Sequence, residues 1–110
     1  MSDMKMSEGA IQKIIANKLR KSGFLVSTMP APNGWPDIRA FGNLRTIMIE
    51  VKKEGKKPTP LQEVMMEKFA DAGAEVYLMD NTYAIDDVIK MTVRDVMEMK
   101  LDEKPRNYTD

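Results

Sequence analysis

Cysteine and histidine are both absent from this chain of 110 residues. Their absence excludes disulfides, zinc fingers, metal sites that contain histidine, and catalytic pairs of the Ser-His or Cys-His kind. Any metal ion that the chain binds must therefore be held by oxygen atoms.

Long hydrophobic runs and an excess of either charge are also missing. No segment approaches the length that spans a bilayer, and the N-terminus lacks the apolar core of a signal peptide, so we expect a soluble intracellular protein with no membrane partner. Seventeen basic and seventeen acidic residues give a formal net charge of zero, whereas nucleic-acid binders are usually basic. The length fits one domain, residues 1–110, around a single core.

A segment near the middle of the chain, residues 46–52, alternates in the manner of a β-strand. Its odd-numbered positions are all β-branched and apolar and would form one face of the strand. Glu50 and Lys52 would lie on the other face. An acid and a base therefore stand side by side on a surface that is otherwise apolar.

A second strand precedes this segment and carries Asp37 near its start. A tight turn at Gly42 and Asn43 would fold the two strands into an antiparallel hairpin, with Asp37 within cross-strand reach of Glu50. Two neighbouring carboxylates repel each other, and one takes up a proton unless a cation neutralises the pair. Oxygen ligands of this kind suit Mg²⁺ or Mn²⁺. The sequence thus predicts a divalent metal site, with Lys52 beside the ion rather than bound to it.

These residues carry a resemblance to a known family. Asp37, followed by Glu50, Val51 and Lys52, resembles the PD-(D/E)xK signature of restriction-endonuclease-like nucleases. Over about residues 6–85 the chain is similar to the VRR-NUC (virus-type replication-repair nuclease) family. The segments that carry this wider similarity are 34–37, 49–53 and Gln62. The resemblance implies that the metal ligands are Asp37, Glu50 and the backbone carbonyl of Val51.

The first helix is predicted over residues 6–22, with Gly23 as its C-terminal stop. Its apolar residues recur at the spacing of one buried stripe, and Glu8 shares that stripe. A carboxylate there is costly unless something pairs with it. Alternatively, Glu8 is a first-turn acid stabilised by the helix dipole. The resemblance favours the first interpretation, because VRR-NUC proteins carry an acid in this helix that completes the metal site.

A second helix is predicted after a loop at 53–58 and should end at Gly73. Thr59 and Gln62 form a capping box, which gives Gln62 a structural explanation. In the family the matching glutamine lies in the active site near the lysine, so both roles stay open. The side chains that this helix is expected to bury are Leu61, Val64, Met65, Phe69 and the stem of Lys68.

The remaining elements complete an α/β fold. A strand at 24–29 follows the first helix, and a fourth strand at 75–79 follows the second. A helix between two strands implies a right-handed crossover, which places the fourth strand beside the third and parallel to part of the sheet. The expected fold class is a restriction-endonuclease-like core, in which a central mixed β-sheet is flanked by helices in the order αβββαβ plus a C-terminal helix.

The C-terminal part is predicted as an extended piece at 82–85 and one helix that reaches about Leu101, followed by a polar tail at about 102–110. Asp86 or Asp87 would cap the helix. The helix contributes several of the 11 methionines and is apolar over a wide arc. Part of that arc could meet a second copy, so we expect a homodimer.

Lysines cluster immediately after the expected site, at Lys52, Lys53, Lys56 and Lys57, and the last three are expected to bind DNA. Such a run is either a solvated loop or, beside a metal site, the place where a phosphate backbone lies. Trp35, just before Asp37, would either stack on an exposed base or anchor its loop in the core.

The resemblance implies a metal-dependent, structure-specific DNA endonuclease of a standalone phage type, in the cytoplasm of a bacterial or phage-infected host cell. We expect a dimeric Holliday-junction resolvase, with a flap or other branched-DNA nuclease as the alternative. A catalytically silent restriction-like DNA-binding module and an ordinary α/β domain with a surface ion pair are the competing interpretations. In the active form the catalytic residues would be Glu8, Asp37, Glu50, Lys52 and Gln62.

Overall fold

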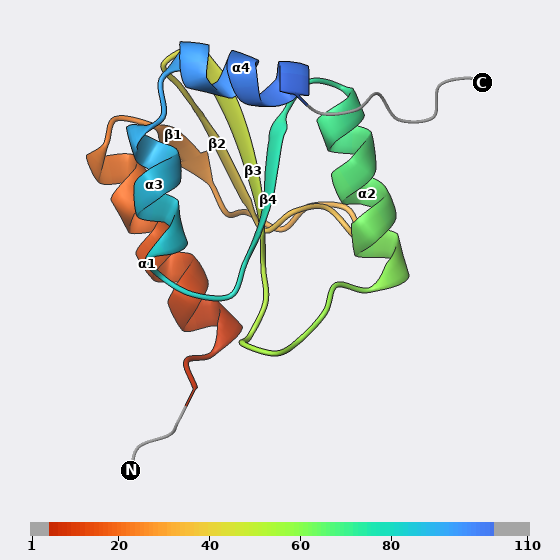
Figure 1. Ribbon diagram of the computed structural model, residues 1–110. Coiled ribbons are helices and arrows are strands. Elements are labelled where there is room, and N and C mark those ends of the chain that lie inside the picture. The colour runs from red at the N-terminus through yellow and green to blue at the C-terminus, as the bar shows by residue number, and fades with distance from the viewer. Residues whose placement is uncertain (1–4, 103–110) are drawn as a thin grey trace, which may run out of the picture.

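The computed structural model describes residues 5–102, which form a four-stranded sheet with helices on both faces (Figure 1). The elements in chain order are α1 (Glu8–Lys21), β1 (Leu25–Ser27), β2 (Ile38–Gly42), β3 (Arg45–Val51), α2 (Pro60–Asp71), β4 (Glu75–Met79), α3 (Ala84–Lys90) and α4 (Val93–Asp102). The strands lie in the order β1-β2-β3-β4, antiparallel except for the parallel pair β3 and β4. The predicted αβββαβ order and mixed sheet are therefore confirmed. Within the described residues, none of the helices is long and apolar enough to cross a bilayer.

The two faces of the sheet are covered to different extents. Helices α1 and α3 lie on one face, α2 lies on the other, and α4 crosses one end (Figure 1). The core lies under α1 and α3 and consists of Ile11, Ile15, Leu19, Phe24, Ile38, Ala40, Ile47, Ile49, Val51, Met79, Ile85 and Val88. In contrast, α2 has no fully buried residue, and Leu61 and Val64 are about half exposed. The predicted burial of its apolar stripe is wrong for Leu61, Val64 and Lys68, which are exposed, whereas Met65 and Phe69 are half-buried. Among the strands and helices, α2 packs mainly against β3 and β4.

The turn between β2 and β3 lies one residue later than predicted, at Asn43 and Leu44. Both residues have positive φ, 52° and 60°, as a two-residue hairpin turn with the twist of the strands requires. Gly42 instead pairs with Arg45 in the ladder. A Cβ at Gly42 would lie 3.0 Å from Cδ2 of Phe24. The glycine therefore allows close packing and does not form the turn.

Helix α3 begins where an extended piece was predicted. The side-chain oxygen of Asn81 accepts hydrogen bonds from the N–H groups of Tyr83 and Ala84, at 3.1 and 2.8 Å. These bonds satisfy the free amides of the first turn and start the helix early. Asp86 and Asp87 consequently lie inside the helix and do not cap it.

The C-terminal segment forms two helices where one was predicted. Thr92 Oγ1 accepts a hydrogen bond from the N–H of Asp95 at 3.1 Å, and the Asp95 carboxylate accepts one from the N–H of Thr92 at 2.9 Å. This reciprocal pair begins α4 separately, and the backbone hydrogen bond lowers the pKa of Asp95. The predicted polar tail lies outside the described residues except for Asp102, which ends α4.

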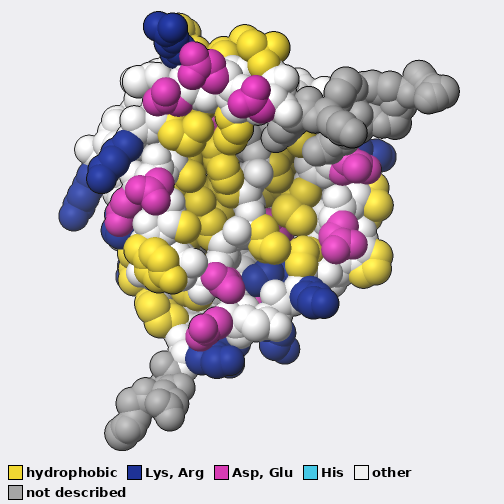
Figure 2. All heavy atoms as spheres, in the orientation of Figure 1, with side chains coloured by type: hydrophobic (Ala, Val, Ile, Leu, Met, Phe, Trp, Pro, Cys, Tyr) yellow, Lys and Arg dark blue, Asp and Glu magenta, His cyan; other side chains and the backbone are white. Residues whose placement is uncertain are grey.

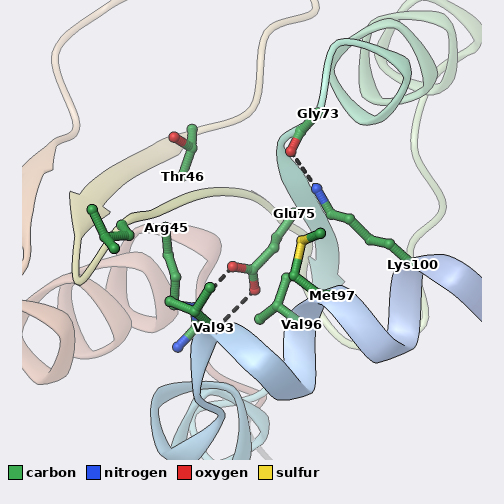
Figure 3. A pocket seen from close by; sticks show the side chains of 9 residues that line it. Arg45, Thr46, Gly73, Glu75, Val93, Val96, Met97 and Lys100 are labelled. Carbon is green, nitrogen blue, oxygen red and sulfur yellow. Dashed lines mark hydrogen bonds and ion pairs between the residues drawn. The ribbon is translucent and has the colours of Figure 1, made fainter.

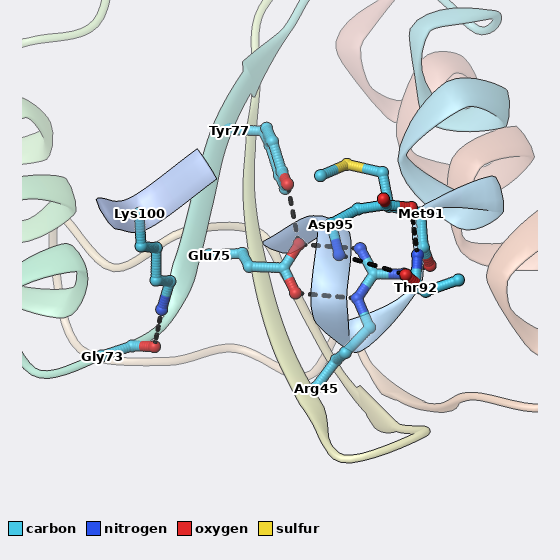
Figure 4. Close-up of polar contacts among 8 residues, drawn as sticks. All are labelled: Arg45, Gly73, Glu75, Tyr77, Met91, Thr92, Asp95 and Lys100. Atoms are coloured by element: carbon cyan, nitrogen blue, oxygen red, sulfur yellow. Dashed lines mark hydrogen bonds and ion pairs between the residues drawn. The ribbon is translucent and has the colours of Figure 1, made fainter. Parts of the chain in front are cut away.

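A buried ion pair fastens α4 to the sheet (Figure 4). Nε and Nη2 of Arg45 donate to the two carboxylate oxygens of Glu75, at 2.8 and 2.7 Å, and both side chains are 2% exposed. Nη1 of Arg45 donates to the carbonyl of Met91, between α3 and α4, at 2.9 Å. The Tyr77 hydroxyl donates to Glu75 at 2.7 Å. The hydrogen bond to Glu75 raises the pKa of Arg45, and burial raises that of Tyr77.

Candidate active site

Asp37 and Glu50 lie next to each other where the ladder between β2 and β3 ends. Ile38 pairs with Ile49, so the antiparallel register places Asp37 opposite Glu50, with both side chains on the α2 face of the sheet. Oδ2 of Asp37 accepts a hydrogen bond from the N–H of Val51 at 2.8 Å. The structure therefore brings these two predicted site residues together.

Glu50 is a buried acid with an unsatisfied oxygen. The residue is 1% exposed, and its Oε1 has no hydrogen-bond partner. Burial, and then the charge of Asp37 and a hydrogen bond with its side chain, raise the pKa of Glu50 to about 8, while the charge of Lys52 opposes the shift. Glu50 therefore keeps a proton at neutral pH unless a cation lies beside it.

The donor atoms at this point fit a hard divalent cation. A buried carboxylate oxygen without a donor, next to a second carboxylate, is the environment that Mg²⁺ or Mn²⁺ would satisfy. Within residues 5–102, no group of three acidic side chains is close enough to hold an ion. The side chains thus offer two carboxylates, and the remaining ligands would be backbone carbonyl and water oxygens.

The sequence predicted that Glu8 lies on the buried stripe of α1, and this prediction is wrong. Glu8 is the first residue of α1, after the cap Ser7, and it is exposed. The helix begins beyond the edge of the core, so position 8 stays outside although its spacing matches the inward face. Oε2 of Glu8 accepts a hydrogen bond from the N–H of Lys53 at 3.2 Å, and its charge is the weakest of the influences that raise the pKa of Glu50. Glu8 therefore contacts the loop after β3.

Lys52 follows β3, and its N–H donates to the carbonyl of Met79 at 2.9 Å. Strand alternation places its side chain on the face of Glu50. Lys53, Lys56 and Lys57 are exposed. Basic side chains gather at the lower end of the molecule, over the loop between β3 and α2 and the start of α1 (Figure 2). The candidate acids thus lie near a basic surface.

Gln62 and Trp35 both make structural contacts. The side chain of Gln62 accepts a hydrogen bond from the N–H of Thr59 at 2.9 Å, and the Thr59 hydroxyl accepts one from the N–H of Gln62 at 3.2 Å. The predicted capping box is therefore confirmed. Trp35 contacts Phe69 of α2 edge to face, with ring centroids 4.8 Å apart, so it anchors its loop to the helix.

Arg39 is a residue near the site that the sequence analysis missed. It lies on β2, is 9% exposed, and donates to the carbonyl of Pro36 at 2.6 Å, to the carbonyl of Met29 and to the hydroxyl of Ser27 at 3.5 Å. A pattern in the sequence could have indicated it. Arg39 follows Asp37 by two positions, so both side chains share one face of the strand.

A cavity of about 130 Å³ lies away from these acids, between the β2–β3 turn and α4 (Figure 3). Its charged groups already have partners, because Arg45 pairs with Glu75 and the Lys100 ammonium donates to the carbonyl of Gly73. Arg45 precedes Glu50 by five positions on β3, or roughly 17 Å along the strand. The cavity is a packing gap under α4 and does not adjoin the candidate site.

Comparison with protein-family models and with curated proteins gave no match. Among solved structures, one described as a VRR_NUC domain shares 29% sequence identity and a TM-score of 0.66, over 76% of this chain and 94% of that one. This similarity supports the assignment of the chain to the VRR-NUC family. A second solved VRR_NUC domain protein matches with a TM-score of 0.68 at 19% identity, over 83% of this chain and 91% of its own, and supports the fold. The VRR-NUC assignment and the restriction-endonuclease-like fold class are confirmed, and the chain forms a nuclease-type domain.

Proposed function

We propose that this VRR-NUC domain is a metal-dependent endonuclease that hydrolyses phosphodiester bonds in DNA. The observation that carries the proposal is the pair of Asp37 and Glu50, with a buried Glu50 oxygen that lacks a donor. A buried carboxylate in this state is costly unless a cation compensates it. Lys52 lies on the same face and its charge reaches Glu50.

Each residue has a role that follows from its place. Asp37, Glu50 and the Val51 carbonyl would hold Mg²⁺ or Mn²⁺, with Glu8 reaching the site through water. A divalent ion bound there would polarise the phosphoryl oxygen, acidify the attacking water and stabilise the leaving oxygen. Lys52 orients the water that attacks phosphorus and offsets negative charge as the bond to the leaving oxygen breaks. Removal of such a group costs on the order of a hundredfold in rate.

The exposed lysines of the loop after β3 support binding to the DNA backbone. Lys53, Lys56 and Lys57 contribute charge without any feature that reads bases, which fits recognition by the shape of branched DNA. We propose four-way-junction cleavage by a homodimer, with flap cleavage as the second candidate.

An apolar stripe on α4 supports the dimer. Val93, Met97 and Leu101 recur at every fourth position and are 37%, 54% and 79% exposed. A second copy could cover such a stripe. Sedimentation of the purified chain tests this part, and a monomer at the concentrations used for cleavage would exclude the paired cutting of a junction by a dimer.

Cleavage of labelled linear duplex, flap and four-way-junction DNA tests the function. The wild type should cut branched DNA with Mg²⁺ or Mn²⁺ and not with chelator. Asp37→Asn, Glu50→Gln and Lys52→Ala should each lose at least a hundredfold in rate, whereas Glu98→Gln, an exposed acid on α4, should cut normally. Binding without cleavage by the wild type would favour the silent DNA-binding module.

A further inference from the structure

A loop without regular structure delivers Asp37 to the candidate site. It joins β1 to β2 and contains three prolines, which have no backbone N–H to donate and do not continue a strand. Its middle is attached to α2, because Gly34 packs closely on Leu61 and Trp35 contacts Phe69. These contacts with α2 hold the middle of the loop and not its two ends.

The guanidinium of Arg39 holds both ends. Nη1 donates to the carbonyl of Pro36, the last residue before Asp37, at 2.6 Å. Nη2 donates to the carbonyl of Met29, where the loop begins. The rigid, planar fork of arginine can join two such acceptors at once, which a lysine ammonium on its flexible stem does less well. One buried side chain therefore closes the loop.

The bond to Pro36 acts directly on Asp37. The carbonyl of Pro36 belongs to the peptide group that also contains the nitrogen and Cα of Asp37, and this group is planar. A hydrogen bond that fixes the oxygen therefore fixes the plane from which the Asp37 side chain projects. The correct projection brings Oδ2 of Asp37 within 2.8 Å of the Val51 nitrogen.

We propose that Arg39 is a positioning residue, which fixes the Pro36–Asp37 peptide plane and thereby holds the Asp37 carboxylate on the Val51 N–H, beside Glu50. Its consequence for metal binding rests on the function proposed above. The positioning itself does not, because the bond between Asp37 and Val51 is a property of the protein alone.

The amide of Val51 reports on this positioning in the metal-free protein. We would compare its NMR shift and hydrogen exchange in the wild type, Arg39→Gln and Arg39→Lys, with Asp37→Ala as the reference for the lost bond. Arg39→Gln should move the Val51 proton shift most of the way to that reference and accelerate its exchange at least tenfold. Arg39→Lys, which can keep one of the two carbonyl contacts, should give a Val51 proton shift and an exchange rate between those of the wild type and Arg39→Gln. An unchanged Val51 amide in folded Arg39→Lys and Arg39→Gln would overturn the proposal.

Arg45→Lys is the matched control, since Arg45 is equally buried but lies on the other face of the sheet. It should lower the melting temperature without moving the Val51 resonance. If it moves that resonance as far as Arg39→Lys does, the effect is general loosening and the proposal fails.

Titration with Mn²⁺ provides a second readout. The two Arg39 variants should bind Mn²⁺ about 10-fold to 100-fold more weakly, as is typical when a residue that orients a metal ligand is lost, and Arg45→Lys should bind it normally. Equal affinity in all four proteins would overturn the positioning role. A wild type that binds no Mn²⁺ would refute the proposed function, while the Val51 amide would still decide the role of Arg39.

Discussion

The carboxyl group of Glu50 lies against that of Asp37 inside the protein, and one of its oxygens has no hydrogen-bond donor. Native proteins rarely leave a buried oxygen in this state. Burial and the neighbouring charge together raise the pKa of Glu50 to about 8. Glu50 therefore destabilises the metal-free fold, and the size of this destabilisation should depend on pH.

Glu50→Gln should stabilise the metal-free protein more as the pH rises. Below about pH 4.5, the ordinary pKa of a glutamate side chain, Glu50 is protonated in both the folded and the unfolded chain, so wild type and variant should differ little. Between that pH and 8 the unfolded chain releases the proton and the folded one keeps it, so the wild type loses stability. The difference should reach on the order of a few kcal/mol. Urea unfolding with chelator at several pH values measures it, and a difference that stays constant with pH would contradict the shifted pKa.

Arg45→Met should destabilise the protein strongly, because it leaves the Glu75 carboxylate buried without its partner. Loss of one member of a buried pair typically costs about 3–5 kcal/mol. Arg94→Met is the control, since its contact with Glu98 is exposed and such pairs contribute about 0.5 kcal/mol. Comparable urea midpoints for the two variants would show that the buried ion pair contributes no more to stability than the exposed one.

Gly34→Ala should destabilise the loop that leads to Asp37. Gly34 has a φ of +85°, and a Cβ there would lie 2.6 Å from Cγ of Leu61, so backbone strain and a clash add up to about 1–3 kcal/mol. Adding Leu61→Ala should recover the stability that the clash costs but not the part that the backbone strain costs. Gly9→Ala, where the nearest atom is 4.0 Å away, should be neutral or stabilising. A Gly34→Ala protein with the wild-type melting temperature would rule out this tight packing.

Gln62→Ala and Thr59→Ala separate capping from catalysis. Both remove one hydrogen bond of the same capping box, and each should cost about 1 kcal/mol of stability. If Gln62 acts only as a cap, the two variants should cleave DNA at equal rates. A much slower Gln62→Ala enzyme would assign Gln62 the active-site role that the family resemblance implies.

Substitution of Lys53, Lys56 and Lys57 by alanine should weaken DNA binding and flatten its salt dependence. The slope of log affinity against log salt should fall by about 0.9 for each duplex phosphate contact that is lost. Lys21→Ala, at the far end of α1 from the site, should leave the slope unchanged. Fluorescence anisotropy at several salt concentrations measures these slopes. Equal slopes for the wild type and the triple lysine variant would show that DNA does not bind to this loop.

Local patterns predicted those parts of the structure that local physics determines. The alternation along β3 predicted which residues share a face, and the Thr59 capping box predicted where α2 begins. The helix between β3 and β4 predicted that these strands are neighbours and that β4 is parallel to part of the sheet, and the structure shows that the parallel partner is β3. Together with a hairpin, these features place Asp37 beside Glu50 without any knowledge of tertiary contacts.

The errors arose where periodicity was taken as burial. Spacing shows which side of a helix is apolar, but not whether another element covers it, and this explains both the exposed Glu8 and the half-exposed Leu61. The two-residue spacing could have placed Arg39 on the face of Asp37, but its acceptors are backbone carbonyls, and the sequence does not show which carbonyls lie within its reach. In the C-terminal region, Asn81 begins α3 earlier than predicted. The cap at Thr92 divides a continuous apolar pattern into two helices.

The uneven covering of the sheet determines which part of the protein opens most easily. α2 buries none of its side chains fully, whereas α1 supplies several core residues, so lifting α2 exposes far less apolar surface than separating α1 from the strands. Amide protons of α2 should accordingly exchange through local fluctuations, and those of α1 through global unfolding. Since Asp37 and Glu50 project toward the α2 side, a large polymer could approach them while the interior beneath α1 stays intact.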